Sequence, residues 1–103
     1  MFEWNMATEL GYEPKTTFWS DFSIADRFGV NAIKDTYMRA FNEWKNEYEY
    51  LTELVMVLNH KSWQFANNDE LCELYAELYY QTLNYAYDNL KGEELSYFLE
   101  VTD

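Results

Sequence analysis

The chain has 103 residues, of which 49% are hydrophobic and 20% aromatic, and its formal net charge at pH 7 is −12. This length and apolar content indicate a single folded domain spanning residues 1–103 and exclude a disordered chain. Nineteen acidic against seven basic residues disfavour direct binding to nucleic acid or to an anionic membrane, because phosphate groups would repel the protein.

The acidic residues dominate the C-terminal part of the chain. Residues 62–103 contain nine acids and a single base, Lys91, whereas residues 1–61 contain ten acids and six bases. Such a surface attracts a basic protein partner, because complementary charge steers association. The same charge also serves plain solubility, and composition does not separate the two interpretations.

We expect a soluble cytoplasmic protein. Cys72 is the only cysteine, so the chain has no internal disulfide framework, as is usual in a reducing compartment. The N-terminus lacks the basic segment and the apolar run of a signal peptide. The longest uninterrupted apolar run, Leu54–Leu58, is too short to cross a bilayer.

Residues 30–91 contain neither glycine nor proline, which predicts a series of helices separated only by capping residues. We therefore predict an all-α fold, a small helical bundle of four to five helices with short connections. Residues 1–16, which include Gly11 and Pro14, show no periodicity and are expected to form an irregular N-terminal arm. The helices are expected at about residues 18–28, 31–45, 48–66, 69–90 and 93–99.

Capping signals mark the first two helices. Thr17 is a suitable N-cap for the first, and Gly29 follows its last turn. Asn31 is expected to cap the second helix, on whose outer side Asp35 and Arg39 have the spacing of an ion pair. The apolar faces of these two helices are predicted from residues three or four apart: Phe18, Phe22, Ala25 and Phe28, then Ile33, Tyr37, Ala40, Phe41 and Trp44.

The third helix is expected to be the centre of the fold. Its run Leu54–Leu58 places apolar side chains in every direction around the helix axis, which implies neighbours on several sides. Asn46 with Glu49 has the spacing of a capping box and predicts a turn over residues 46–50. Because the apolar period continues through that turn, the pattern leaves open whether residues 31–66 form one helix or two.

The fourth helix is predicted to be one-sided. Asn67 with Glu70 has capping-box spacing and marks its start. Its buried stripe is expected to comprise Leu71, Leu74, Tyr75, Leu78, Thr82, Tyr85, Ala86 and Leu90. The opposite side carries polar residues at steps of three or four, namely Glu70, Glu73, Glu77, Gln81, Asn84 and Asp88.

This polar stripe has two interpretations. A row of carboxylates on a rigid helix can imitate a phosphate backbone and occupy a basic groove on a partner protein. Alternatively, the stripe is only the solvated side of a helix whose other side is buried. The candidate partner-binding residues are those of the stripe that carry charge, together with two acids that open the last helix: Glu70, Glu73, Glu77, Asp88, Glu93 and Glu94.

We expect no enzymatic activity, and no catalytic, cofactor-binding or metal-binding residues. Cys72 lies between Glu70 and Glu73, whose negative charges oppose its use as a thiolate nucleophile. His60 is the only histidine, and although Glu53 shares its helix face, neither His-Glu-x-x-His nor Glu-x-x-His occurs. Phosphate-binding loops, nucleophile elbows and glycine-rich dinucleotide turns are missing from the sequence.

One segment has part of the pattern of a DNA-binding helix-turn-helix. Within Ser23–Val30, an alanine is followed four residues later by a glycine and then by an apolar residue, as in a compact turn between two helices. The next helix departs from the motif, because Asp35 stands where a buried aliphatic residue is needed. An ordinary helix corner is the preferred interpretation.

Four segments resemble a group of small acidic proteins encoded in mobile elements and prophage-like regions of anaerobic gut bacteria: Tyr12–Trp19, Asp21–Asp26, Tyr50–Asn59 and Asn89–Leu95. The similarity spans most of residues 12–103. The group has no assigned activity, so the resemblance transfers no functional residue. It implies a context in which some small acidic proteins inhibit host-defence nucleases, in certain cases by imitating DNA.

Two hypotheses follow. The first is a non-enzymatic interaction protein whose acidic surface, chiefly on the fourth helix, engages a basic protein partner such as a nucleic-acid-binding enzyme. The alternative is a structural or assembly subunit, a homo-oligomer that associates through exposed aromatic rings, for which Trp4, Trp19 and Tyr80 are the candidates.

Overall fold

The computed structural model describes residues 16–102, which form five helices and no strand. The predicted all-α bundle is confirmed, and residues 31–66 belong to two helices rather than one. Residues 1–15 of the predicted N-terminal arm lie outside the described residues. The helices are α2 (Phe18–Ala25), α3 (Val30–Trp44), α4 (Tyr48–Gln64), α5 (Asp69–Asn89) and α6 (Glu93–Thr102).

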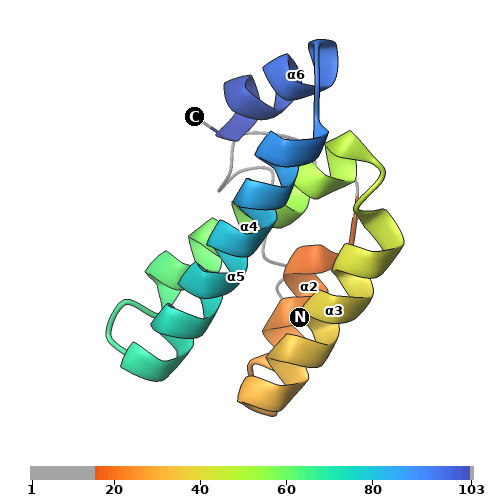
Figure 1. The fold of residues 1–103 in the computed structure, drawn as a ribbon. Helices are drawn as coiled ribbons and strands as arrows, with labels where there is room; N and C mark the ends of the chain where they lie inside the picture. The colour runs from red at the N-terminus through yellow and green to blue at the C-terminus, as the bar shows by residue number, and fades with distance from the viewer. Residues whose placement is uncertain (1–15, 103) are drawn as a thin grey trace.

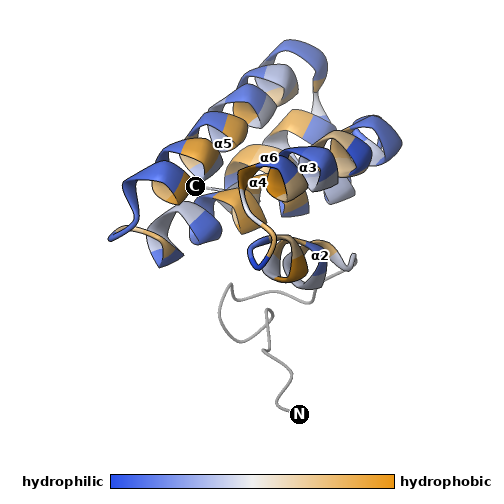
Figure 2. Cartoon of the chain, turned by 90° about the horizontal axis from the view of Figure 1, so that it is seen from below, coloured by the Kyte–Doolittle hydropathy of each residue, from blue (hydrophilic) through white to orange (hydrophobic). Residues whose placement is uncertain are grey.

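Helices α4 and α5 form the longest and most extensive helix pair, joined by a short turn (Figure 1). Helices α2 and α3 pack together and lie on one side of this pair. Helix α6 crosses the end of the pair at which α5 finishes. In Figure 2 the hydrophobic colour of α4 is found in its middle part, which lies among the other helices.

Helix α4 belongs to both apolar clusters of the fold. Leu54, Val57 and Leu58 pack in a larger cluster with residues of α2, α3 and α5. Leu51 and Val55 pack in a smaller cluster with residues of α5 and α6. The prediction that α4 is the centre of the fold is therefore confirmed, and its run of apolar residues is explained by neighbours on several sides.

The residues predicted to form the apolar face of the first helix are buried, except for the last of them. Phe18, Phe22 and Ala25 are buried, whereas the side chain of Phe28 is 75% exposed. Helix α2 ends at Ala25, three residues earlier than predicted, so the turn that follows no longer keeps the helical period. Gly29 follows this turn with φ 100°, a backbone conformation that favours glycine.

Three of the predicted N-caps are wrong. Asn31 lies inside α3, whose N-cap position is taken by Gly29, and Asn46 precedes Glu47, the N-cap residue of α4. The cap of α5 is Asn68 rather than Asn67, because the Asn68 side chain accepts a hydrogen bond from the backbone N–H of Leu71 at 3.2 Å. Each error is a shift of one or two residues; α3 and α4 begin at Gly29 and Glu47 without a side-chain cap, and α5 begins at the second of two adjacent asparagines.

Two further local predictions differ from the structure. Thr17 holds the N-cap position of α2, but its hydroxyl donates to the Asp21 carboxylate at 2.9 Å instead of accepting from the backbone. The predicted Asp35–Arg39 ion pair is not formed; the Arg39 guanidinium lies 3.5 Å from the Thr36 hydroxyl. Both residues of that pair are exposed, where such contacts contribute little to stability.

Candidate functional site

The acidic stripe predicted on the fourth helix lies on the outer side of α5. The apolar side of that helix packs against α4, where Leu74, Tyr75, Leu78, Thr82 and Ala86 are buried. Because an α-helix repeats every 3.6 residues, the positions midway between these point away from the core. All four acids predicted on this stripe, and the two that open α6, are exposed: Glu70, Glu73, Glu77, Asp88, Glu93 and Glu94. We call these six residues the acidic face.

The carboxylates of the acidic face have no charged partner. None of the six forms an ion pair with another residue that the structure describes. Glu77 accepts only a long hydrogen bond, 3.5 Å, from the Gln81 side-chain amide. Charges without internal partners are available to an external cation, and their mutual repulsion falls when one binds.

The charge density along α5 is moderate. Glu70 and Asp88 are eighteen residues apart, so the stripe is about 27 Å long at the rise of an α-helix. Its four carboxylates therefore give one charge in about 7 Å, compared with one in about 1.7 Å along a DNA duplex. This spacing suits a compact basic patch on a protein better than a groove built to hold a whole duplex.

Two exposed tyrosines border the acidic face. Tyr80 and Tyr87 follow Glu73 at intervals of seven residues, so they lie along one edge of the stripe, 59% and 50% exposed respectively. Tyr80 makes an edge contact with Tyr79, and Tyr87 makes one with Phe98 of α6. A tyrosine ring beside carboxylates can receive an arginine or lysine side chain through a cation–π contact.

Trp4 and Trp19 are the other two aromatic residues that were predicted to be exposed. Trp4 lies outside the described residues. Trp19 is half-buried, with its ring centroid 4.9 Å from that of His60 and 4.3 Å from the Lys61 ammonium nitrogen. The prediction for Trp19 is therefore wrong. The exposed rings that the sequence did not indicate are Phe28, Trp63 and Tyr87.

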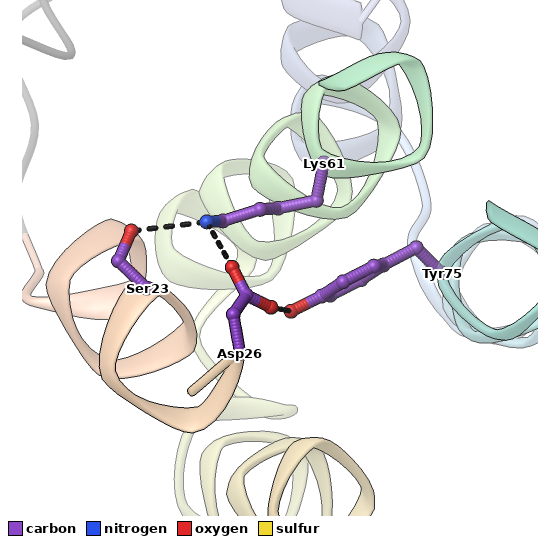
Figure 3. Close-up of polar contacts among 4 residues, drawn as sticks. All are labelled: Ser23, Asp26, Lys61 and Tyr75. Atoms are coloured by element: carbon purple, nitrogen blue, oxygen red, sulfur yellow. Dashed lines mark hydrogen bonds and ion pairs between the residues drawn. The ribbon is translucent and has the colours of Figure 1, made fainter. Parts of the chain in front are cut away.

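A buried ionic network was not predicted from the sequence (Figure 3). The Lys61 ammonium donates to the Asp26 carboxylate at 2.7 Å and to the Ser23 hydroxyl at 3.0 Å. The Tyr75 hydroxyl donates to the second carboxylate oxygen of Asp26. The network connects the end of α2 to α4 and α5. A sequence signal existed, because Lys61 follows Leu54 by seven residues and Leu58 by three, on the buried side of α4.

Burial and charge act in opposite directions on the pKa of Lys61. Burial lowers the pKa of its ammonium, and the hydrogen bond and charge of Asp26 partly offset that effect. For Tyr75, burial, the hydrogen bond to Asp26 and the charge of Asp26 all raise the pKa of the hydroxyl. The side chain of Lys61 is only 1% exposed, so its amine is enclosed by protein and serves to hold three helices together.

The same network occupies the segment with the partial helix-turn-helix pattern. Ser23 and Asp26 both face Lys61, so two polar residues of this corner are used in packing α2 onto α4 (Figure 3). In α3, Asp35 is exposed rather than buried as the DNA-binding motif would require. Packing of α2 onto α4 therefore explains the polar residues of this corner.

Glu53 and His60 do not form a joint site. Glu53 is buried, and its carboxylate accepts hydrogen bonds from the backbone N–H and the hydroxyl of Thr16. The half-buried ring of His60 packs on Trp19. Within residues 16–102, no three His, Cys, Asp or Glu side chains are arranged to hold a metal ion. Cys72 is a half-buried free thiol.

Among the helices of the described chain, none is long and apolar enough to span a membrane. Comparison of the chain with protein-family models, with curated proteins and with solved structures finds no match.

Proposed function

We propose that the chain is a non-enzymatic interaction protein that binds a basic surface of a partner protein through its acidic face. The observation that carries the proposal is the set of exposed carboxylates on one side of α5, none of which is neutralised within the described chain. The adjoining rings of Tyr80 and Tyr87 supply apolar contact area, which tyrosines commonly provide at the centre of protein interfaces.

The partner class that fits this surface best is a nucleic-acid-binding protein, because such proteins present clustered lysine and arginine side chains. A resemblance to small acidic proteins of mobile elements favours a host-defence nuclease as the specific case. Imitation of DNA is the narrower form of the proposal. The low density of charge, about one in 7 Å, favours contact with part of a basic surface over replacement of a complete duplex.

The test compares two double variants that each remove two negative charges. Glu73→Gln/Glu77→Gln neutralises the middle of the acidic face, whereas Glu47→Gln/Glu100→Gln neutralises two exposed acids outside it, one just before α4 and one in α6. Both proteins and the wild type are immobilised and exposed to host lysate, and bound proteins are released with rising salt. We expect a basic protein to be retained by the wild type and the control variant but not by the first variant.

Retention of the same proteins by all three would contradict the proposal. If added duplex DNA releases the captured protein, this result supports imitation of DNA. If added duplex DNA does not release it, the proposal is restricted to a basic surface outside the partner's nucleic-acid site.

Self-association through aromatic surface is the second candidate function. It is favoured by the exposure of Phe28 and Trp63, whose side chains are 75% and 73% accessible. If the chain self-associates, its average molar mass in light-scattering measurements should rise with protein concentration. Trp63→Ser should prevent this rise. A constant monomer mass at high concentration would contradict it.

A further inference from the structure

An open groove of about 670 Å³ lies between α2 and α3. One side is formed by residues of α2, including Ile24 and Ala25, and by Phe28 in the turn that follows, and the other side by a stripe of α3 that includes Ala32 and Ala40. None of its lining residues comes from α5, so the groove is separate from the acidic face.

The groove exists because the facing stripes carry small side chains. Ala25, Ala32, Thr36 and Ala40 all line it, and at these positions the two helices have little side-chain volume with which to fill the space between them. Phe18 closes part of its floor and is buried. The volume lies in the range of pockets that hold small molecules or a few side chains of a peptide.

Large apolar side chains stand at the mouth of this groove. Ile24 of α2 and Phe28 of the turn after it are 56% and 75% exposed, and both line the groove. At its other end, Trp44 and Tyr50 meet edge to face with ring centroids 4.4 Å apart. Exposed apolar side chains grouped around a hollow favour an apolar ligand group.

The rim of the groove is predominantly acidic. Among the described residues, it carries the carboxylates of Asp21, Asp35 and Glu43 but only one cation, Arg39. None of these four side chains forms an ion pair within residues 16–102. A ligand that brings positive charge to this rim gains attraction that an acidic or neutral ligand lacks.

We propose that the α2–α3 groove binds an amphipathic segment of a partner protein, with apolar side chains in the groove and lysine or arginine on its rim. An amphipathic helix with apolar residues three or four apart matches the stripes that form the two walls. This site lies outside the acidic face and does not depend on the function proposed for that face.

The probe is a short synthetic peptide with leucine at helical spacing and lysine at the intervening positions. A matched peptide carries glutamate in place of every lysine. Binding is followed through backbone amide resonances of the full chain. We expect the lysine peptide to shift resonances of Ala32 and Thr36 in the groove, and the glutamate peptide to bind more weakly.

The matched variants are Ile24→Ser/Phe28→Ser, which removes the apolar mouth, and Trp63→Ser, which removes an exposed ring outside the groove. Because all three side chains are largely exposed, we expect both variants to fold. Ile24→Ser/Phe28→Ser should weaken binding of the lysine peptide by about tenfold. The second, and Glu73→Gln/Glu77→Gln in the acidic face, should leave the groove shifts unchanged.

Three outcomes would overturn the proposal. One is that the lysine peptide shifts only resonances of α5 and α6, which would place all its binding on the acidic face. Another is that Ile24→Ser/Phe28→Ser binds the peptide as well as Trp63→Ser does. The third is that groove resonances move with protein concentration alone, which would show that a second copy of the chain covers the groove.

Discussion

Lys61 links α4 to the end of α2 through a buried ion pair. Its ammonium is removed from water and reaches a single carboxylate, Asp26, whose side chain is 12% exposed. The ring of Trp19 lies 4.3 Å from the ammonium nitrogen and adds a cation–π contact. A buried charge is costly to leave without its counter-ion, so the two partners should respond differently to substitution.

Asp26→Ala should destabilise the protein by about 3–5 kcal/mol, because it leaves Lys61 buried without a counter-ion and removes the acceptor of the Tyr75 hydroxyl. Lys61→Met should cost less, since Asp26 keeps the Tyr75 hydroxyl and some contact with water. The double variant should lose less than the sum of the two single losses. Urea unfolding measures all three, and simple additivity would argue against a coupled pair.

The pKa shifts predict how stability changes at alkaline pH. Burial raises the pKa values of Tyr75, Tyr37 and Tyr79, so the folded state keeps protons that the unfolded state loses above a pH of about 10. Stability should therefore fall as pH rises beyond that value. The lowered pKa of Lys61 makes stability rise with pH up to a pH of about 10.5. This is the effect of a single group, whereas the three tyrosines together lower stability at alkaline pH.

Tyr75→Phe isolates the largest part of this effect. Titration followed by tyrosinate absorbance should show that the wild type ionises its last tyrosines only as it unfolds. In the variant, the loss of stability with alkaline pH should be shallower, although its stability at neutral pH should be about 1 kcal/mol lower because Asp26 loses a hydrogen bond. An identical pH dependence in the two proteins would contradict the assignment to Tyr75.

At the scale of elements, α4 was the most predictable. The side chains of its run Leu54–Leu58 can be buried only if other helices pack on several sides of α4, and both apolar clusters include this helix. The buried stripe of α5 was equally clear, because a single period runs through it from Leu74 to Ala86. Long periodic patterns determine which side of a helix is buried almost independently of the details at its ends.

The ends of helices and the polar interior were less predictable. Asn67 and Asn68 are chemically identical, and only the path of the chain decides which of them caps α5. The Lys61–Asp26 pair joins residues 35 positions apart, and periodicity within one helix contains no information about such a contact. For the candidate site, the pattern located the carboxylates, whereas their exposure and lack of ion pairs required the three-dimensional arrangement.

The cap of α5 provides a test at this scale. Asn68→Ala should lower the free energy of unfolding by about 1 kcal/mol, because the backbone N–H of Leu71 loses its acceptor. Asn67→Ala, in the exposed turn one residue earlier, should change stability by less than about 0.5 kcal/mol. Thermal or urea unfolding of the pair measures both values, and an equal effect of the two substitutions would contradict the observed cap.

For the whole molecule, the arrangement separates two surfaces of different character. The acidic face lies on the outer side of α5 and at the start of α6, while the groove lies between α2 and α3. Figure 1 shows where these helices lie in the fold. The buried network around Lys61 joins these two parts through α4. A charge of −12 further implies that the molecule meets basic partners faster at low salt than at high salt.

The central claim is that the acidic face binds a basic partner, and the salt dependence of affinity tests it most directly. The dissociation constant of the captured partner is measured over a range of salt for the wild type, Glu73→Gln/Glu77→Gln and Glu47→Gln/Glu100→Gln. We predict that the first variant binds more weakly at low salt and with a shallower salt slope, whereas the control follows the wild type. Equal affinities and equal slopes for all three proteins would contradict the claim.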